Sequence, residues 1–207
     1  MSKATEDFEE YFGLPKQFFH DLQSEDDWSL VVKLHALLET ACSVLLAEEL
    51  GHPEITDPFS KVQMGNRGNG KLAFIYTLNL LQKHEIAFLE ILGVLRNKFA
   101  HNVASTGISL NAVIETMNPE ERRKCRKALA MKATINSQGR EYPASELVEK
   151  QPEVAIWVFS SQILSKVHLM MIGAKMRQAF ISKKISAHLE EHGPFRLREG
   201  ESSFADR

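Results

Sequence analysis

Arg96 and His101 are the two residues whose types and spacing best suit chemistry at a phosphate group. They open and close the run Arg96-Asn97-Lys98-Phe99-Ala100-His101. An arginine carries a permanent charge on a planar group that can hold two phosphate oxygens. A histidine, with an ordinary pKa of about 6.5, exchanges protons near neutrality. Asn97 could orient the phosphate or the imidazole without titrating. The run therefore predicts phosphate binding coupled to proton transfer.

The places of these residues on a helix predict a site that two subunits share. The buried face of that helix is marked by an apolar stripe of Phe88, Leu92, Leu95 and Phe99. At about 100° per residue, Arg96 lies about 70° to one side of the stripe and His101 about 150° to the other. A phosphate held by both residues requires a helix that ends near Ala100 or a second copy of the chain. We expect a homodimer with a composite cleft.

A purely structural role is the alternative for the same two residues. A histidine at a helix C-terminus interacts favourably with the helix dipole and can cap the last carbonyl groups. Arg96 would then be a solvated charge beside the apolar stripe. This alternative requires no catalysis.

The run resembles the R-(polar)-x-x-x-H signature of the HEPN superfamily, all-α domains of which many members are metal-independent ribonucleases. The stretches LAFIYTLNLL and HEIAFLEILGVLRNKFAHN, with the amphipathic helix and glycine-rich loop before them, resemble its mannitol operon repressor branch. The similarity spans roughly residues 28–115.

The resemblance implies cleavage of single-stranded RNA by attack of the 2′-hydroxyl on the adjacent phosphorus. His101 would be the general base, Arg96 would stabilise charge on the phosphate, and Asn97 would assist. DNA would bind without being cut, because it lacks the 2′-hydroxyl. Such a protein would act as a toxin or defence effector, with a possible cognate antitoxin. A non-catalytic transcriptional regulator that acts through protein partners is the second reading, and a bare helical scaffold is the third.

A run of basic residues downstream predicts a surface for RNA. Together with Lys98, its members Arg122, Arg123, Arg126 and Lys127 are candidate phosphate contacts. The alternative is a solvated helix face balanced by Glu120 and Glu121.

Three short motifs are incomplete as metal or cofactor sites. GNRGNGKL (65–72) places Leu72 where a phosphate loop needs a hydroxyl, and no apolar strand precedes it. HLEEH (188–192) lacks a convincing third zinc ligand. HEIAF (84–88) has Phe88 at the second ligand position. We expect neither a metal nor a cofactor.

Apolar residues recur at three- and four-residue steps throughout, which predicts an all-α helical bundle. A capping box at Ser24 and Asp27 should start a helix that Gly51 and Pro53 stop. Further helices are expected over roughly 71–82, 84–100, 119–133 and 152–190, and a loop over 134–145. In the last helix, a stripe from Ile156 to Ala174 should resume at Ile181 and Ile185, with a kink near Gly173 or a packing partner.

Length and composition predict one domain. The chain has 207 residues, 43% hydrophobic residues, a net charge of -2 and two cysteines. We expect a peripheral segment over 1–23, a single HEPN-like domain over 24–192 and a disordered tail over 193–207. Polar residues interrupt the apolar stretch 155–174, and no apolar leader is visible, so a cytoplasmic location without membrane contact is expected.

Overall fold

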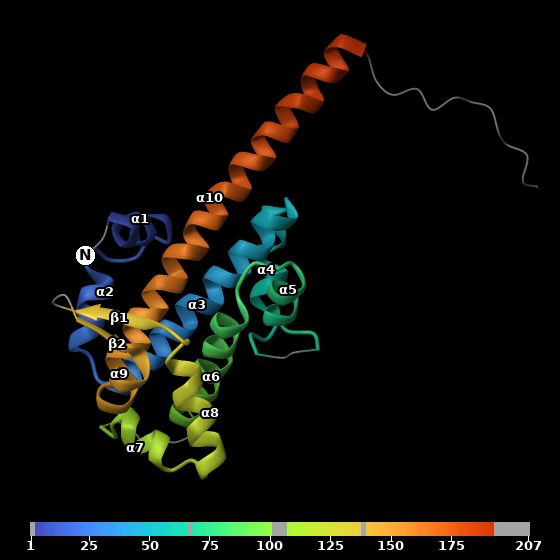
Figure 1. The fold of residues 1–207 in the computed structure, drawn as a ribbon. Helices are drawn as coiled ribbons and strands as arrows, with labels where there is room; N and C mark the ends of the chain where they lie inside the picture. Colours follow the sequence, from blue (N-terminus) through green and yellow to red (C-terminus); the bar gives the residue numbers. More distant parts are fainter. Residues whose placement is uncertain (1–2, 66–67, 101–106, 138–139, 193–207) are drawn as a thin grey trace, which may run out of the picture.

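The computed structural model describes residues 3–65, 68–100, 107–137 and 140–192 (Figure 1). Helices account for 77% of the structure and strands for 3%, which confirms the all-α prediction. His101 and the tail 193–207 lie outside the described residues.

Helix α3 (Asp27–Leu50) lies at the centre and contacts α4, α5, α6 and α10 (Figure 1). The Asp26 carboxylate caps it by accepting a hydrogen bond from the Ser29 N–H at 3.0 Å. The predicted capping box is therefore wrong, because Ser24 belongs to the preceding turn η1 (Leu22–Ser24). The helix ends as predicted at Gly51, whose φ of 76° suits a residue without Cβ.

Helix α10 (Pro152–His192) packs along α3 and then continues well beyond it as one unbroken helix (Figure 1). The first part of the predicted stripe is buried, namely Ile156, Phe159, Ile163, Val167 and Ala174. Ile181 and Ile185 are exposed. The stripe resumes at these two residues on the same unbroken helix, and it is exposed there because α3 ends before the helix reaches them.

Helices α5 (Lys71–Thr77) and α6 (Lys83–Ala100) form the wall beside α3 that carries the Arg96 region. The stripe of Phe88, Leu92, Leu95 and Phe99 is buried as predicted. Helix α5 is shorter than the predicted 71–82, since Asn79 takes a positive φ of 53°. The turn η2 (Pro53–Ile55) and helix α4 (Thr56–Ser60) connect α3 to this wall.

The N-terminal segment is part of the core. It forms α1 (Lys3–Tyr11) and α2 (Phe18–Asp21), and buries Phe8, Phe19 and Leu22. The Glu9 carboxylate accepts hydrogen bonds from the backbone N–H groups of Gln17 and Phe19, both at 3.1 Å. The prediction of a peripheral segment over 1–23 is therefore wrong.

The remaining elements lie at the end of the bundle opposite the last part of α10 (Figure 1). Helices α7 (Leu110–Glu115) and α8 (Pro119–Leu129) lead to the strands β1 (Thr134–Ser137) and β2 (Arg140–Pro143) and to α9 (Ala144–Lys150). Asn118 caps α8, which begins at Pro119 as predicted but stops at Leu129, before Met131 and Lys132 take positive φ angles.

The predicted loop over 134–145 is wrong, because β1 and β2 pair as an antiparallel hairpin. Ile135 faces Tyr142 across the hairpin, and both are partly buried. Cross-strand pairs of this kind stabilise two short strands.

Helices α3 and α10 are long and apolar enough to cross a membrane by length and composition alone. Within the apolar window of α3, 67% is buried inside the protein, and for α10 the share is 50%. A core helix gives the same signal, so this similarity to a membrane span is weak. The cytoplasmic location stays a prediction.

Candidate functional site

Arg96 and Asn97 lie near the C-terminal end of α6. The Arg96 Nη1 donates a hydrogen bond to the Asn97 Oδ1 at 3.0 Å. Arg96 is partly buried, whereas Asn97 and Lys98 are exposed. Among the described residues, no carboxylate forms an ion pair with Arg96. Its guanidinium is therefore held by Asn97 and has no carboxylate of the described residues in direct contact.

A groove of about 600 Å³ lies beside these two residues, between α3, α6 and the segment before α5. We call it the α3–α6 groove. It is lined by His35, Glu39, Gln63, Met64, Gly65, Glu90, Gly93, Val94, Arg96 and Asn97.

His35 reaches the groove from α3, and its side chain is only 8% exposed. Its Nδ1 lies 3.8 Å from the Glu39 Oε2. A Cβ at Gly93 would lie 3.4 Å from the His35 Nε2, so this edge of the ring faces α6 at a residue without a side chain. Gly93, Arg96 and Asn97 are three and four positions apart and share one face of α6. The imidazole and the guanidinium therefore line the same groove.

The surroundings of His35 favour its neutral form. Burial lowers its pKa below the ordinary 6.5, and the positive charges of Arg96 and Lys71 act in the same direction. The Glu39 carboxylate opposes them, but it is the weaker influence beside burial. A neutral imidazole at neutral pH can accept a proton.

Lys71 stands behind the groove and is fully buried. Its Nζ lies 3.1 Å from the Glu39 Oε1 and 3.5 Å from the Ser60 carbonyl oxygen. The Lys71 and Leu72 N–H groups donate to the carbonyl oxygens of Gln63 and Met64. The lysine of the GNRGNGK stretch is thus committed to Glu39, and the first amides of α5 are committed to the backbone. Both features support the interpretation that this stretch is not a phosphate loop.

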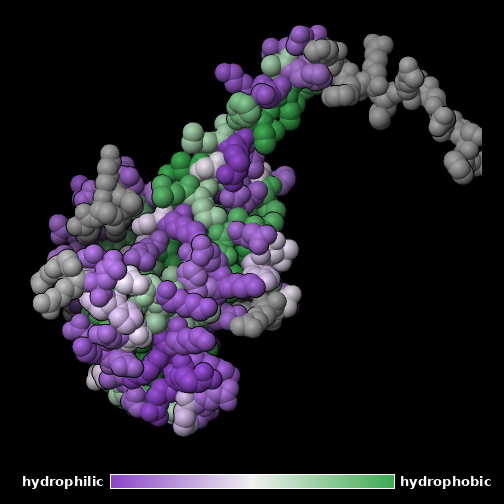
Figure 2. All heavy atoms as spheres, viewed as in Figure 1, coloured by the Kyte–Doolittle hydropathy of each residue, from purple (hydrophilic) through white to green (hydrophobic). Residues whose placement is uncertain are grey.

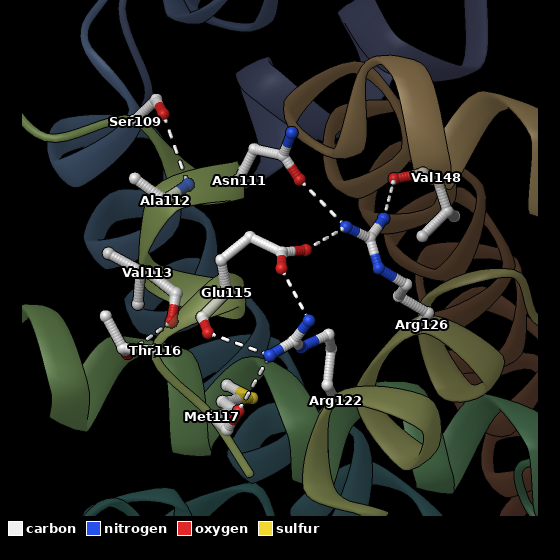
Figure 3. A network of polar contacts seen from close by, with 10 residues as sticks. All are labelled: Ser109, Asn111, Ala112, Val113, Glu115, Thr116, Met117, Arg122, Arg126 and Val148. Carbon is white, nitrogen blue, oxygen red and sulfur yellow. Dashed lines mark hydrogen bonds and ion pairs between the residues drawn. The ribbon is translucent and has the colours of Figure 1, made fainter. Parts of the chain in front are cut away.

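The basic run on α8 is divided between structural and solvent-facing residues. Figure 3 shows the contacts of its two structural members, Arg122 and Arg126. Arg122 binds the Glu115 carboxylate at 2.6 Å and also donates to the carbonyl oxygens of Glu115 and Met117. Arg126 donates to Glu115, Asn111 and the Val148 carbonyl oxygen at 2.9, 2.9 and 3.1 Å.

These contacts fasten α8 to α7 and α9. They favour a structural role for Arg122 and Arg126. The carboxylate that pairs with both is that of Glu115, whereas the alternative named Glu120 and Glu121. Lys124 pairs with Glu120, as the alternative reading of the run expected. Arg123 and Lys127 are the exposed members of the predicted RNA-binding set on α8.

The two cysteines do not suit a nucleophilic role. Both are buried, and burial raises the pKa of the Cys42 thiol to about 12 and that of Cys125 to about 11. A thiol of this kind holds its proton at neutral pH. Within the described ranges, no group of three or more His, Cys, Asp or Glu side chains is arranged to hold a metal ion.

Sequence reasoning identified Arg96 and Asn97 as site residues. It did not identify His35, Glu39, Lys71 or Gly93, which line the groove or stand behind it. One signal was available, since His35 and Glu39 interrupt an apolar helix at a four-residue spacing. The predicted partner His101 lies outside the described residues.

No protein family, no curated protein and no solved structure matches this chain. The resemblance to the HEPN superfamily therefore rests on the residues quoted for it above, and the assignment stays a prediction.

Proposed function

We propose that this chain is a metal-independent endoribonuclease of the HEPN type that cleaves single-stranded RNA in the α3–α6 groove. The observation that carries the proposal is that Arg96 and His35 line one groove of one protomer. A cation for the phosphate and a neutral histidine for proton transfer are the two groups that this reaction needs.

In the proposed reaction, the RNA 2′-oxygen forms a bond to phosphorus and the bond from phosphorus to the 5′-oxygen breaks. His35 takes the proton from the 2′-hydroxyl, the role that the sequence assigned to His101. Arg96 stabilises the charge on the phosphoryl oxygens, and Asn97 keeps the guanidinium in place. His101 would return a proton to the leaving 5′-oxygen. The products are a 2′,3′-cyclic phosphate and a 5′-hydroxyl end.

The position of His35 also bears on whether the proposed site needs a second subunit. Arg96 and His101 lie on different sides of an ideal helix, which is why the sequence predicts a composite cleft. A histidine that enters from α3 reaches the Arg96 groove within the same protomer. The composite homodimer cleft therefore stays a prediction that the chemistry no longer demands.

The test is cleavage of end-labelled single-stranded RNA in excess EDTA by the parent protein and by folded variants. General base catalysis contributes about 10²–10⁴ in rate, so His35→Asn should lower the rate constant by at least about 10². Arg96→Ala should lower it by about 10²–10³. Arg177→Ala removes an exposed arginine of α10 that is outside the predicted RNA-binding set, and is the matched control, with a rate close to that of the parent.

His101→Ala in the same assay separates the two assignments of the base. Loss of cleavage in Arg96→Ala and His101→Ala but not in His35→Asn would return the base to His101. Equal cleavage by the parent and by Arg96→Ala would contradict the proposal.

A non-catalytic regulator that acts through protein partners is the second candidate. It is favoured by large apolar side chains on the outer face of α10, where Leu169, Met176 and Phe180 are exposed. A parent protein that leaves RNA intact but captures a defined transcription factor would favour this candidate. The role of toxin or defence effector, with a cognate antitoxin, belongs to the first proposal and would be tested by growth arrest that depends on Arg96.

A further inference from the structure

The last part of α10 projects beyond the rest of the described structure (Figure 1). Its final described contacts with α3 are the Arg177–Glu49 ion pair at 2.6 Å and the hydrogen bond from the Gln178 Nε2 to the Glu48 carbonyl oxygen at 3.3 Å. From Gln178 to His192 the helix rises about 21 Å at about 1.5 Å per residue. A single helix of this length is marginal in water without a packing partner.

This projecting segment, residues 178–192, carries an exposed apolar stripe. Ile181, Ile185 and Leu189 are 55%, 55% and 40% exposed and follow one another at four-residue steps. On a helix of about 100° per residue, they continue the face that Val167, Met171 and Ala174 bury against the body. Figure 2 shows hydrophobic surface that runs from the body up along α10. The stripe thus continues the buried face of α10 beyond the point where α3 ends.

We propose that the stripe is covered by the same segment of a second copy of this chain, in antiparallel orientation about Ile185. In that arrangement the two Ile185 side chains meet at the axis, and Ile181 of each copy faces Leu189 of the other. The inference is independent of the proposed ribonuclease activity.

The length of the projecting segment fits this pairing. When Ile185 lies on the axis, residue 192 of one copy reaches the level of Gln178 of the other. That level is where α10 leaves its own body, next to Leu50, which is exposed at the end of α3. The two segments therefore overlap over their full length, and the two bodies lie at opposite ends.

The charges beside the stripe favour the antiparallel direction. Arg177, Lys184 and Glu191 are seven positions apart, so they lie along one edge of the stripe. Antiparallel pairing sets Arg177 of each copy, which also pairs with Glu49 of its own α3, near Glu191 of the other, twice per dimer. The Lys184 ammonium between them turns outward over the Phe180 ring of its own helix, 5.0 Å from the centroid. A parallel pair would set the two bodies against each other.

Each copy contributes three large apolar side chains. The surface area that they can bury is smaller than the roughly 800 Å² per partner of a standard interface. We therefore expect a weak, reversible dimer. The same geometry keeps the two α3–α6 grooves far apart, since His35 lies about 22 Å below the end of α3 in each copy. This dimer would not create a composite cleft.

The first measurement is sedimentation velocity of the full chain from low micromolar to submillimolar concentration. The apparent mass should rise from 23.4 kDa toward twice that value. Ile185→Asp should remain at the monomer mass at every concentration, and its folding should be intact because the residue is exposed. Met176→Asp alters an exposed apolar residue of the opposite face and should associate like the parent.

The second measurement tests direction and register by disulfide formation. Ile185→Cys should crosslink with itself under mild oxidation, whereas Ile181→Cys should crosslink with Leu189→Cys and not with itself. Cys42 and Cys125 are buried and do not compete. A parent that stays monomeric, an Ile185→Asp variant that still associates, or self-crosslinking of Ile181→Cys would overturn the inference. A monomer that instead binds anionic lipid vesicles through the stripe would overturn it as well.

Discussion

His35 and Gly93 show how single residues form the groove. The imidazole approaches α6 beside Gly93, where a Cβ would lie 3.4 Å from its Nε2, and Arg96 follows on the next turn of the same face. The sequence could predict Arg96 and Asn97 because their spacing is local. It could not predict His35, because the histidine joins the groove through the packing of α3 against α6.

Lys71 should contribute more to stability than an ordinary surface lysine. Lys71→Ala removes a fully buried ammonium and leaves Glu39 and the Ser60 carbonyl oxygen without it. Because Glu39 is partly exposed and can rehydrate, the cost is expected at about 2 kcal/mol, below the range for a fully buried pair. Lys61→Ala, which breaks the exposed pair with Asp57, should cost less than about 0.5 kcal/mol. Urea unfolding of both variants measures the difference, and equal midpoints would contradict it.

The buried histidines should make the protein less stable in mild acid. Burial lowers the pKa of both His35 and His168 below 6.5. Below pH 6.5 the unfolded chain therefore binds more protons than the folded chain, so the free energy of unfolding should fall as the pH drops from about 7 to about 5.

Urea unfolding across this pH range tests the effect, with His35→Asn expected to flatten the slope. His20→Asn, at an exposed histidine, is the control. A slope unchanged by His35→Asn would show that its protonation does not differ between the folded and unfolded states.

At the level of elements, the existence of the long helices was predictable and several of their ends were not. The apolar periods of α3, α6 and α10 are long enough to identify each helix. The cap of α3 was misplaced because Ser24 and Asp26 are both good capping residues, and the choice between them depends on the turn η1. The hairpin β1–β2 was missed because two four-residue strands carry little alternation of their own.

Arg126 should hold α7, α8 and α9 together. Its guanidinium binds Asn111 and Glu115 of α7 and the Val148 carbonyl oxygen of α9 (Figure 3). Arg126→Ala should therefore cost about 2 kcal/mol of stability, since hydrogen bonds of a charged group are worth about 1.5–3 kcal/mol. Lys124→Ala, in an exposed pair on the same helix, should cost less than about 0.5 kcal/mol. Thermal unfolding distinguishes the two, and a loss from Lys124→Ala as large as from Arg126→Ala would argue against this anchoring role.

At the level of the whole molecule, the two ends of the described chain were the hardest to predict. Phe8 and Phe19 looked peripheral because the surfaces that cover them come from α10, far along the sequence. The ring of Phe8 packs against His168 with centroids 5.8 Å apart, and the Trp157 Nε1 donates to the Phe19 carbonyl oxygen at 2.7 Å. Periodicity placed Ile181 and Ile185 on the same stripe as the buried residues of α10, but it does not say where the neighbouring helix stops, and both are exposed.

The N-terminal segment should unfold together with the rest of the protein. Phe8→Ala removes a fully buried ring and should cost about 3–5 kcal/mol, which corresponds to a fall in Tm of roughly 10 °C for a chain of this size. Phe180→Ala removes an exposed ring and should leave Tm within about 2 °C of the parent. Calorimetry should show one cooperative transition for the parent. A separate transition of the N-terminal segment at lower temperature, with the Tm of the main transition unchanged by Phe8→Ala, would contradict this prediction. The segment would then be peripheral.

The most direct test of the central claim uses a pool of DNA oligonucleotides that each carry one ribonucleotide, with all bases represented around it. In excess EDTA, the parent protein should cut only on the 3′ side of the ribonucleotide and leave a 2′,3′-cyclic phosphate and a 5′-hydroxyl. Arg96→Ala should lose this cleavage, and Arg177→Ala should keep it. Cutting at deoxyribonucleotides, or cutting by Arg96→Ala at the parent rate, would contradict the assignment of the α3–α6 groove as a ribonuclease site.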